Sequence, residues 1–283
     1  MTGEAIKRAC VIGYPIRHSR SPLIHGHWLE TNGLAGSYDR VEVAPEEIGD
    51  FITGLAERGY VGCNVTVPHK QAVFDLVTRR DGAADAIGAV NTVWLEDGVL
   101  HAANTDVSGF LDNLDATLPG WDGAARRAVV LGAGGAARGI VYGLLRRGVT
   151  EIAVVNRTLA HARDLAAAMG PAVSAHGWER LPGLLEGADL FVNTTSLGMS
   201  GQPPLAVDLS PLPVQATVVD IVYVPLETDL LRQARARGNA VVDGLGMLLH
   251  QAVPGFERWF GVRPRVTEDL RRLLVADIEG RAG

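Results

Sequence analysis

The chain has 283 residues, of which 47% are hydrophobic, 20% charged and 6% aromatic, and its formal net charge is −6. This composition is typical of a globular protein of nearly two average domains, each able to bury a core without disulfide or metal staples. The excess of 32 acidic over 26 basic residues argues against nucleic acid as a partner, because phosphate neutralisation needs clustered cations. The longest stretch without charged side chains, 190–207, is too polar to span a membrane.

Cysteine usage and the N-terminal residues favour a cytoplasmic protein. The two cysteines, Cys10 and Cys63, fall in different predicted strands and form neither a disulfide framework nor a CxxC site. Charged residues precede a short apolar run at the N-terminus, a pattern unlike that of a signal peptide. Because the sequence contains no HExxH motif and no cluster of Cys and His, we expect no metal site.

Short β-branched runs alternate with helical patterns, which predicts an α/β fold with mostly parallel sheets. In the first part of the chain we expect strands at 9–13, 38–43 and 61–66, and a hairpin formed by 90–95 and 99–103. One helix is expected to start with Ser21 as its N-cap and Pro22 at its first position, and others over 45–58 and from Pro68. His25 and His27 are expected to be a surface pair on the first of these helices.

A polar stretch at 112–127 precedes a second α/β series and is expected at the surface near the domain junction. Strands are predicted at 128–131, 152–155, 190–193, 218–222 and 240–242, with helices at 136–147, 159–169 and 226–237. The tail is predicted to be helical over 247–260 and 266–279, with no further strand. Such a tail is expected to pack back on the first domain, which predicts a discontinuous domain of 1–106 plus 247–283 and a second domain of 107–246.

A glycine-rich loop follows the first strand of the second series. Residues 132–137 read G-x-G-x-x-A between an apolar strand and a helix. In this motif the first glycine permits a tight turn, the second lets the backbone approach a pyrophosphate, and the small third residue lets helix and strand pack closely. The helix N-terminus then holds the anion. The sequence therefore predicts a Rossmann-type dinucleotide-binding domain.

The residues after the next strand favour NADP over NAD. An NAD site usually places an acidic side chain there for the ribose hydroxyls, but this chain has Asn156, Arg157 and Thr158. The planar Arg157 guanidinium can bind a 2′-phosphate and stack on adenine, and Thr158 adds a hydroxyl donor.

Polar residues also cluster at four strand ends in the first part of the chain, within 19–21, 64–70, 91–92 and 104–106. Ligands bind at the carboxyl ends of strands in open α/β sheets. Taken singly, each residue has an ordinary structural role: Ser21 and Asp106 suit helix caps, Asn91 a turn, and Lys70 a solvated helix. Taken together, beside a nucleotide-binding domain, they favour a site for a small polyhydroxylated acid.

In their order along the chain these motifs resemble the shikimate dehydrogenase family over essentially the full length. The matching segments are 13–22, 62–70, 88–92, 104–106, 132–137, 156–158, 193–199, 220–223 and 244–252. The resemblance implies an NADP-dependent oxidoreductase acting on a CH–OH group, which reversibly reduces 3-dehydroshikimate to shikimate by hydride transfer from NADPH. It places the reaction in the shikimate pathway to chorismate and the aromatic amino acids, and we expect a monomer or homodimer.

By motif position, the resemblance also implies roles for individual residues. Lys70 and Asp106 would be the catalytic pair. Ser19 and Ser21 would bind the substrate carboxylate. The ring hydroxyls would be held by Thr66, Asn91, Asp106 and Gln251, with Tyr223 near the substrate. The cofactor would be bound by Gly132, Ala133, Gly134, Gly135, Ala136, Asn156, Arg157, Thr158, Ile221 and Gly244, of which Ile221 and Gly244 would lie by the nicotinamide.

Two histidines depart from the family pattern. His69 stands where the family often has Phe, and we expect it to pack or contact solvent rather than relay a proton. His161 stands where a second basic residue often holds the 2′-phosphate, so strict selection of NADP is an open question. If His161 contacts the phosphate, the affinity for NADP should rise at acidic pH.

Three alternatives have distinct signatures. A quinate/shikimate or aminoshikimate dehydrogenase would show relaxed cofactor use. A tetrahydrofolate-linked dehydrogenase would need a pterin-sized pocket, which Ser19 and Ser21 suit less well than a small carboxylate. A non-catalytic nucleotide-sensing relative would bind the nucleotide without turnover, against which the presence of both Lys70 and Asp106 argues.

Overall fold

Two six-stranded sheets organise the chain, and each belongs to its own folding unit. In this computed structural model, which describes residues 6–280, unit 1 combines residues 6–106 with Gln251–Asp277. Unit 2 consists of Val107–His250 and residues 278–280. The chain therefore leaves unit 1 within helix α5 (Thr105–Thr117) and returns to it after helix α11 (Gly244–His250).

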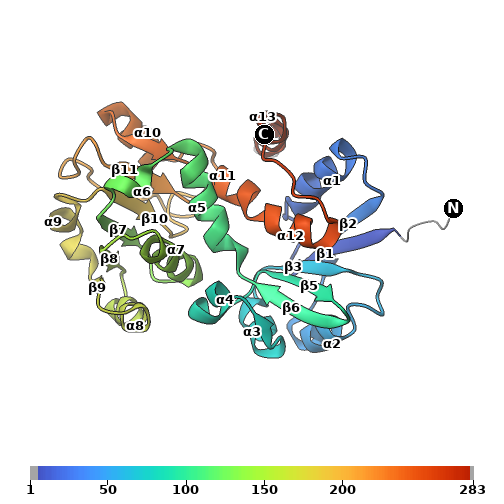
Figure 1. Cartoon of the computed structure of the whole chain (residues 1–283). Coiled ribbons are helices and arrows are strands. Elements are labelled where there is room, and N and C mark those ends of the chain that lie inside the picture. The colour runs from blue at the N-terminus through green and yellow to red at the C-terminus, as the bar shows by residue number, and fades with distance from the viewer. Residues whose placement is uncertain (1–5, 281–283) are drawn as a thin grey trace. The chain divides into compact units, whose positions relative to one another are not determined.

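Unit 1 contains six strands, with the order β2-β1-β3-β5-β6-β4 across its sheet. The strands are β1 (Lys7–Gly13), β2 (Gly36–Glu42), β3 (Gly62–Val65), β4 (Arg79–Arg80), β5 (Thr92–Glu96) and β6 (Val99–Ala103). The helices are α1 (Ser21–Thr31), the 3-10 turn η1 (Pro45–Glu47), α2 (Ile48–Thr53), α3 (Lys70–Leu76), α4 (Gly82–Ile87), α12 (Ala252–Phe260) and α13 (Glu268–Gly280). Figure 1 shows α2 and α3 below this sheet and α1 and α12 above it.

The direction of β5 determines which residues meet at one edge of this sheet. The edge at which β3 and β6 end and β5 begins is called the functional edge. Strands β1, β2 and β3 are parallel, whereas β5 runs antiparallel to both of its neighbours, β3 and β6. Strands β3 and β6 therefore point the same way, and β5 points the opposite way. As a result, the first residue of β5 lies at the same edge of the sheet as the last residues of β3 and β6.

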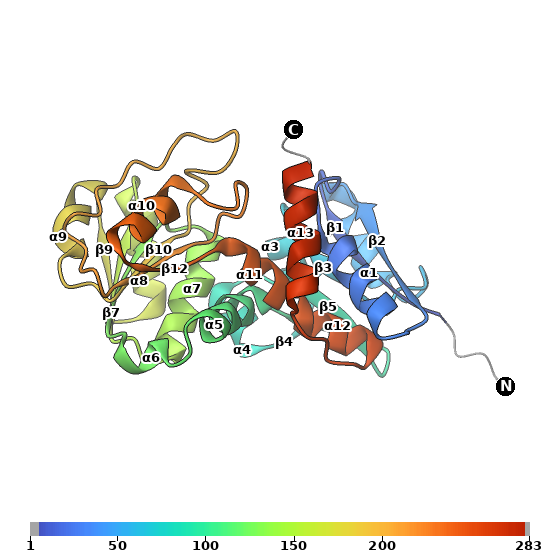
Figure 2. The same cartoon turned by 90° about the horizontal axis from the view of Figure 1, so that it is seen from above.

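The C-terminal part of the chain completes the core of unit 1. The indole of Trp259, in α12, is 2% exposed and donates from Nε1 to the Val93 carbonyl of β5 at 2.9 Å. Gly62 of β3 makes this approach possible, because a Cβ at that position would run into the Trp259 indole and the Val93 carbonyl. In Figure 2, α13 lies alongside α1.

His25 is a buried residue, so the expected surface pair with His27 is wrong. Helix α1 buries Ser21, Ile24, His25, Trp28 and Leu29, a face with helical spacing that includes His25. The His25 imidazole is fully buried and stacks on the Tyr38 ring, with 4.0 Å between the ring centroids. Neither ring nitrogen has a hydrogen-bond partner among the described residues. Burial lowers the pKa of His25 to about 3, although the nearby Asn64 side chain opposes this shift.

Unit 2 has the strand order β12-β11-β10-β7-β8-β9, and all of its strands are parallel. The strands are β7 (Arg127–Leu131), β8 (Glu151–Val155), β9 (Val173–His176), β10 (Leu190–Asn193), β11 (Thr217–Asp220) and β12 (Ala240–Val242). The helices besides α5 and α11 are α6 (Trp121–Ala124), α7 (Gly135–Arg146), α8 (Leu159–Met169), η2 (Trp178–Arg180), α9 (Leu181–Leu185) and α10 (Asp229–Arg237). This is the doubly wound order of nucleotide-binding sheets, and it confirms the predicted Rossmann-type fold.

Helices cover both faces of the second sheet. Gly143 of α7 lies close to Val107 and Leu111 of α5, where a Cβ would be only 3.2–3.5 Å from their side chains. Residues of α9 and α10 join a separate buried cluster around Phe191 of β10. Figure 2 shows α9 and α10 apart from α5 and α7, as a doubly wound sheet requires.

Several local expectations need correction. The helix expected over 45–58 ends at Thr53, and turns continue to Gly59, whose φ of +79° favours glycine. Ser21 is the first residue of α1 rather than its N-cap, and the Ser19 hydroxyl accepts the Ser21 N–H instead, at 3.3 Å. The polar stretch at 112–127 contains the end of α5 and all of α6, and β4, α4, β9 and α9 were not expected.

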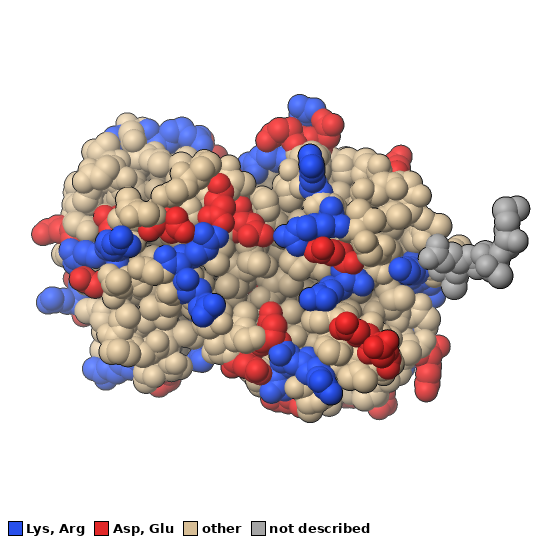
Figure 3. Space-filling model, viewed as in Figure 1, with Lys and Arg blue, Asp and Glu red and all other residues tan. Residues whose placement is uncertain are grey.

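Charged side chains of both signs lie in small mixed groups on the face drawn in Figure 3. That view shows no continuous basic surface of the kind that would bind nucleic acid. Among residues 6–280, no helix is long and apolar enough to cross a membrane.

The buried His25 predicts acid sensitivity of unit 1. Below about pH 6.5 the unfolded chain protonates this histidine, whereas the folded protein does so only near pH 3. The free energy of unfolding should therefore fall between these pH values, by roughly 3 kcal/mol at pH 4.5 through this residue alone. In a His25→Leu variant, urea unfolding from pH 7.5 to 4.5 should show a loss smaller by about that amount. His27→Leu is the matched control, and equal slopes for His25→Leu and the original protein would contradict the prediction.

Candidate active site

Lys70 and Asp106 meet at the functional edge of the unit 1 sheet. Lys70 is the first residue of α3, five residues after β3 ends, and Asp106 lies in the first turn of α5, shortly after β6 ends. The Lys70 Nζ donates to Asp106 Oδ2 at 2.5 Å. The two side chains are 30% and 25% exposed, so a ligand can reach them while water only partly screens them.

Asn91 completes this cluster from the neighbouring strand. It immediately precedes β5, and the reversed direction of β5 brings it to the ends of β3 and β6. Its Nδ2 donates to Asp106 Oδ1 at 2.8 Å. The Asp106 carboxylate therefore accepts from Asn91 through one oxygen and from Lys70 through the other. A carboxylate held in this way has a fixed plane and a fixed cation beside it.

The two serines form a second polar group in unit 1. The Ser19 hydroxyl donates to the Ser21 hydroxyl at 3.3 Å. Their loop is held by two basic side chains: Arg40 Nε donates to the Ser19 carbonyl at 2.8 Å, and Arg20 pairs with Asp277 of α13 at 2.9 Å. Hydroxyls on an anchored loop are suited to bind a small anion.

The remaining residues expected to bind substrate lie at separate points. Thr66 directly follows β3, and its backbone N–H donates to the Ile12 carbonyl at 2.9 Å. Gln251 directly precedes α12 and belongs to unit 1, whereas Tyr223 belongs to unit 2. His69 is 1% exposed, and its Nε2 lies 2.8 Å from the Val43 carbonyl, which agrees with the expected packing role.

No sequence pattern assigned a role to the buried polar side chains behind the pair. Asn64, Thr92 and Thr105 stood out only as polar residues at strand ends, yet the structure joins all three to Asn91 by hydrogen bonds. Tyr38 extends this layer and was missed entirely, because a tyrosine within a strand has no pattern that distinguishes it from a packing residue.

In unit 2 the glycine-rich loop has the geometry that its motif predicts. Gly132 has a φ of +108°, and a Cβ there would lie 2.5 Å from Thr194 Oγ1. Gly134 and Gly135 have no atom within 4 Å of an added Cβ, so the backbone from Gly134 into α7 is open to a ligand. The loop lies between β7 and β10, where the strand order reverses, and dinucleotides bind at this point in doubly wound sheets. Ala133 and Ala136 are the small residues that line the same turn.

The residues after β8 are free of acidic side chains. Asn156 Nδ2 donates to the Thr158 carbonyl at 2.9 Å, which holds the turn that leads into α8. Arg157, Thr158 and His161 are all exposed at the beginning of this helix. These residues fit a 2′-phosphate, because they supply a cation and a hydroxyl and no opposing carboxylate.

The strand β11 leads to the remaining cofactor candidates. Asp220, its last residue, is fully buried and accepts from Asn193 Nδ2 at 2.9 Å and from Thr228 Oγ1 at 2.7 Å. Burial raises the pKa of Asp220, and these hydrogen bonds oppose the shift. The next residue, Ile221, approaches Gly244 so closely that a Cβ on Gly244 would run into the Ile221 carbonyl. Gly244 is therefore required by its surroundings.

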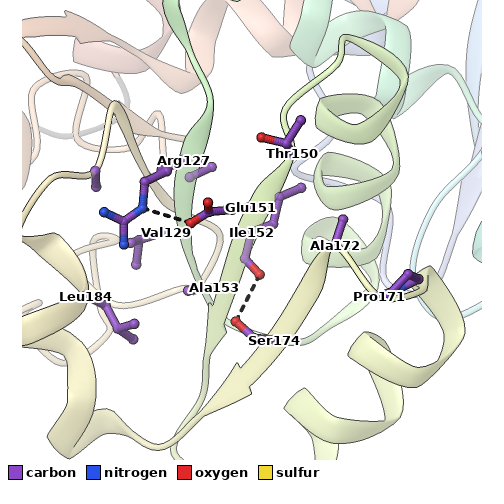
Figure 4. Close-up of a pocket in the computed structure, with 12 residues that line it drawn as sticks. Arg127, Val129, Thr150, Glu151, Ile152, Ala153, Pro171, Ala172, Ser174 and Leu184 are labelled. Atoms are coloured by element: carbon purple, nitrogen blue, oxygen red, sulfur yellow. Dashed lines mark hydrogen bonds and ion pairs between the residues drawn. The ribbon is translucent and has the colours of Figure 1, made fainter.

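A separate pocket lies at the opposite edge of the unit 2 sheet. It has a volume of about 240 Å³ and opens beside the starts of β7 and β8, between Arg127 and Ser174. Figure 4 shows the Arg127–Glu151 ion pair, 3.1 Å long and largely exposed, at one side of it. It contains none of the residues expected to bind ligands. Within residues 6–280, no group of three His, Cys, Asp or Glu side chains could hold a metal ion.

Three family models match the chain. The one described as the shikimate dehydrogenase substrate binding domain covers residues 11–93, and the one described as shikimate / quinate 5-dehydrogenase covers 118–200. The third, described as the shikimate 5′-dehydrogenase C-terminal domain, covers residues 244–274.

Curated relatives match along nearly the whole chain. The protein is 56% identical over 276 residues to a shikimate dehydrogenase (NADP(+)) of Azorhizobium caulinodans, with 98% of each chain covered. It is 58% identical over 275 residues to the enzyme of the same name from Mesorhizobium japonicum, with 97% of this chain and 98% of the relative covered.

Solved structures show the same architecture. A quinate dehydrogenase from Corynebacterium glutamicum in complex with NAD has a TM-score of 0.88 and 32% identity, over 96% of this chain and 99% of that chain. A shikimate 5-dehydrogenase from Thermus thermophilus in complex with NADP(H) and shikimate has a TM-score of 0.82 and 35% identity, over 95% of this chain and 100% of that chain.

Gly132 and Gly134 of this loop should respond differently to alanine. Gly132→Ala places a side chain at a φ of +108° and against Thr194, so we expect a loss of about 1–3 kcal/mol in the free energy of unfolding of unit 2. Gly134→Ala, with a φ of −87° and open space, should stay within about 1 kcal/mol of the original protein. Guanidinium unfolding measures both, and equal stability of the two variants would contradict this account of the loop.

Proposed function

The chain belongs to the shikimate dehydrogenase family, as its motifs predicted, and from this premise we propose that it is an NADP(H)-dependent shikimate dehydrogenase. It reversibly reduces 3-dehydroshikimate to shikimate, a step on the pathway to chorismate and the aromatic amino acids. The name shared by its curated relatives specifies NADP(+), and the cation and hydroxyl that follow β8 support the same cofactor.

The observation that carries this proposal is the Lys70–Asp106–Asn91 cluster. Reduction of a ketone requires hydride delivery to the carbonyl carbon and proton delivery to the carbonyl oxygen. NADPH supplies the hydride when it is bound. The Lys70 ammonium, held by Asp106 at 2.5 Å, is placed to stabilise the negative charge that develops on the oxygen and to donate the proton to it. In the reverse direction the pair must accept the hydroxyl proton.

Substrate binding is assigned mainly to residues of unit 1. Ser19 and Ser21 bind the substrate carboxylate, supported by the anchoring of their loop through Arg40 and Arg20. The ring hydroxyls are held by Thr66, Asn91, Asp106 and Gln251, and Tyr223 lies near the substrate.

Cofactor binding is assigned to unit 2. The pyrophosphate lies against Gly132, Ala133, Gly134, Gly135 and Ala136, where the open backbone leaves room for it. Asn156, Arg157 and Thr158 hold the 2′-phosphate end, and Ile221 and Gly244 lie by the nicotinamide. With these assignments we propose a catalytic, substrate-binding domain of 1–106 plus 247–283 and an NADP-binding domain of 107–246. The compact units differ from these bounds, because 247–250 and 278–280 belong to unit 2.

We further propose a cytoplasmic protein, a monomer or homodimer with no nucleic acid or membrane partner. Cys10 and Cys63 support a reducing compartment, because they are buried free thiols at paired positions of β1 and β3 and form no disulfide. The neighbouring Cys63 thiol and burial raise the pKa of Cys10, which disfavours the reactive thiolate.

One rival remains chemically close. The quinate dehydrogenase from Corynebacterium glutamicum, solved in complex with NAD, shares this architecture. Arg157, which favours a 2′-phosphate, argues for NADP in this chain.

Crossing shikimate and quinate with NADP⁺ and NAD⁺ tests the function, with the near-ultraviolet absorbance of the reduced nicotinamide as the signal. We expect turnover with shikimate and NADP⁺ to exceed the other three combinations. Arg157→Ala should raise the KM for NADP⁺ about tenfold or more, because a hydrogen bond to a charged group is lost. It should raise the KM for NAD⁺ much less, because NAD⁺ lacks the 2′-phosphate and can lose only the stacking on adenine. Quinate or NAD⁺ used with equal efficiency would assign the chain to the rival class. Nucleotide binding without any turnover would assign it to a sensing role.

A further inference from the structure

A layer of buried polar side chains lies behind the Lys70–Asp106 pair, and none of them takes part in the proposed chemistry. Tyr38 of β2, Asn64 of β3, Thr92 of β5 and Thr105 of α5 are 8%, 6%, 1% and 4% exposed. The side chains of Lys70 and Asp106 are 25–30% exposed, so the layer is the buried side of the site. Buried polar groups are costly unless their hydrogen bonds are satisfied, so the orientation of each of these side chains is informative.

The Asn64 amide can adopt only one orientation. Its terminal atom at 3.1 Å from the Asn91 backbone carbonyl must be the nitrogen, because a carbonyl oxygen accepts and cannot donate. The Asn64 oxygen therefore faces Tyr38, whose hydroxyl donates to it at 2.5 Å. The same Asn64 nitrogen donates to the Thr92 hydroxyl at 3.1 Å.

The Asn91 amide is fixed by the same reasoning. Its oxygen accepts from the Thr105 backbone N–H at 2.8 Å, a group that can only donate. It also accepts from the hydroxyls of Thr92 and Thr105, each at 3.1 Å. The Asn91 nitrogen is therefore left to face Asp106, to which it donates at 2.8 Å. A flipped amide would place its nitrogen against the Thr105 N–H and its oxygen against the Asp106 carboxylate.

These bonds form one directional series. Tyr38 donates to Asn64, and Asn64 donates to the Thr92 hydroxyl. The Thr92 and Thr105 hydroxyls, 3.1 Å apart, lead on to the Asn91 oxygen, and Asn91 donates to the Asp106 carboxylate. Successive hydrogen bonds that point the same way polarise one another, most strongly where the surroundings are dry. The series thus ends on the charged oxygen that lies opposite the one bound to Lys70.

We propose that Asn64 and Thr92 are positioning residues, which set the Asn91 amide and through it hold the Asp106 carboxylate in the plane needed for proton transfer. This inference rests on the proposed function, because it assumes that Lys70 and Asp106 carry the proton. Apolar side chains of the same shape would stabilise the fold about equally, since replacing both partners of a buried hydrogen bond is nearly neutral. The polarity of the layer therefore serves the orientation of the site.

The Thr92→Val and Thr92→Ser variants test the proposal, because valine matches threonine in shape without its hydroxyl and serine keeps the hydroxyl. In Thr92→Val the kcat with shikimate and NADP⁺ should fall about tenfold or more, as expected for a misplaced catalytic group. The Kd for NADP⁺ should not change. Thr92→Ser should recover a kcat within about threefold of the original protein, since the hydroxyl that orients Asn91 is restored. A kcat of Thr92→Val equal to that of the original protein would overturn the proposal.

A structural control separates positioning from loss of stability. Asn239 is a buried amide in unit 2 that donates to the carbonyls of Pro213, Val214 and Ala216 and to no residue of the site. Asn239→Ala should lower Tm and leave kcat per folded molecule unchanged. If Thr92→Val instead loses activity only in proportion to its folded fraction, as Asn239→Ala would, the role is structural and the proposal fails.

Two further measurements cover the remaining outcomes. If Thr92→Val does not fold, Tyr38→Phe removes the first donor of the series and should lower kcat by about twofold or more through the loss of cooperative polarisation.

If the original protein does not oxidise shikimate, the proposed function fails, and hydrogen exchange of the Asn91 side-chain amide still tests the positioning. Faster exchange in Thr92→Val than in the original protein would support it, and equal exchange would overturn it.

Discussion

One reversed strand in a largely parallel sheet creates the candidate active site. Because β5 runs antiparallel between β3 and β6, residues that start β5 share an edge with residues that follow β3 and β6. This brings Asn91 to the Lys70–Asp106 pair, although 20 residues separate Asn91 from Lys70 and 14 separate it from Asp106 along the chain. With all three strands parallel, Asn91 would lie at the opposite edge and the Asp106 carboxylate would lack its second donor.

One side of this edge is partly exposed to solvent and the other side is buried. Lys70 and Asp106 remain a quarter to a third exposed, as a group that must exchange protons with a ligand requires, whereas Asn91 and Thr92 are almost completely buried. Backbone groups, which can only donate or only accept, orient the two asparagines of this layer. The geometry of the charged pair therefore follows from the backbone of the sheet rather than from the pair alone.

The sequence was sufficient to predict the fold class, the glycine-rich loop and the polar residues at the strand ends, because these depend on local patterns. Glycine at 132 is required by a φ that other residues rarely adopt, and the strand–loop–helix context is visible in a single stretch. His25 was misjudged because its burial depends on Tyr38, Phe256 and Trp259, which come from distant segments. Tyr38 and the orientation of Asn64 were out of reach for the same reason: a hydrogen bond between strands leaves no local signature.

Whether Lys70 and Asp106 act as one unit is the central claim, and a double-mutant cycle of kcat tests it most directly. Lys70→Ala and Asp106→Ala should each lower kcat with shikimate and NADP⁺ by about 100-fold or more, as expected for loss of general acid–base catalysis. The double variant should lose little more than the worse single variant, because removing either partner already disables the pair. If the two losses multiply in the double variant, the residues act independently, and the account of a single hydrogen-bonded proton-transfer unit is contradicted.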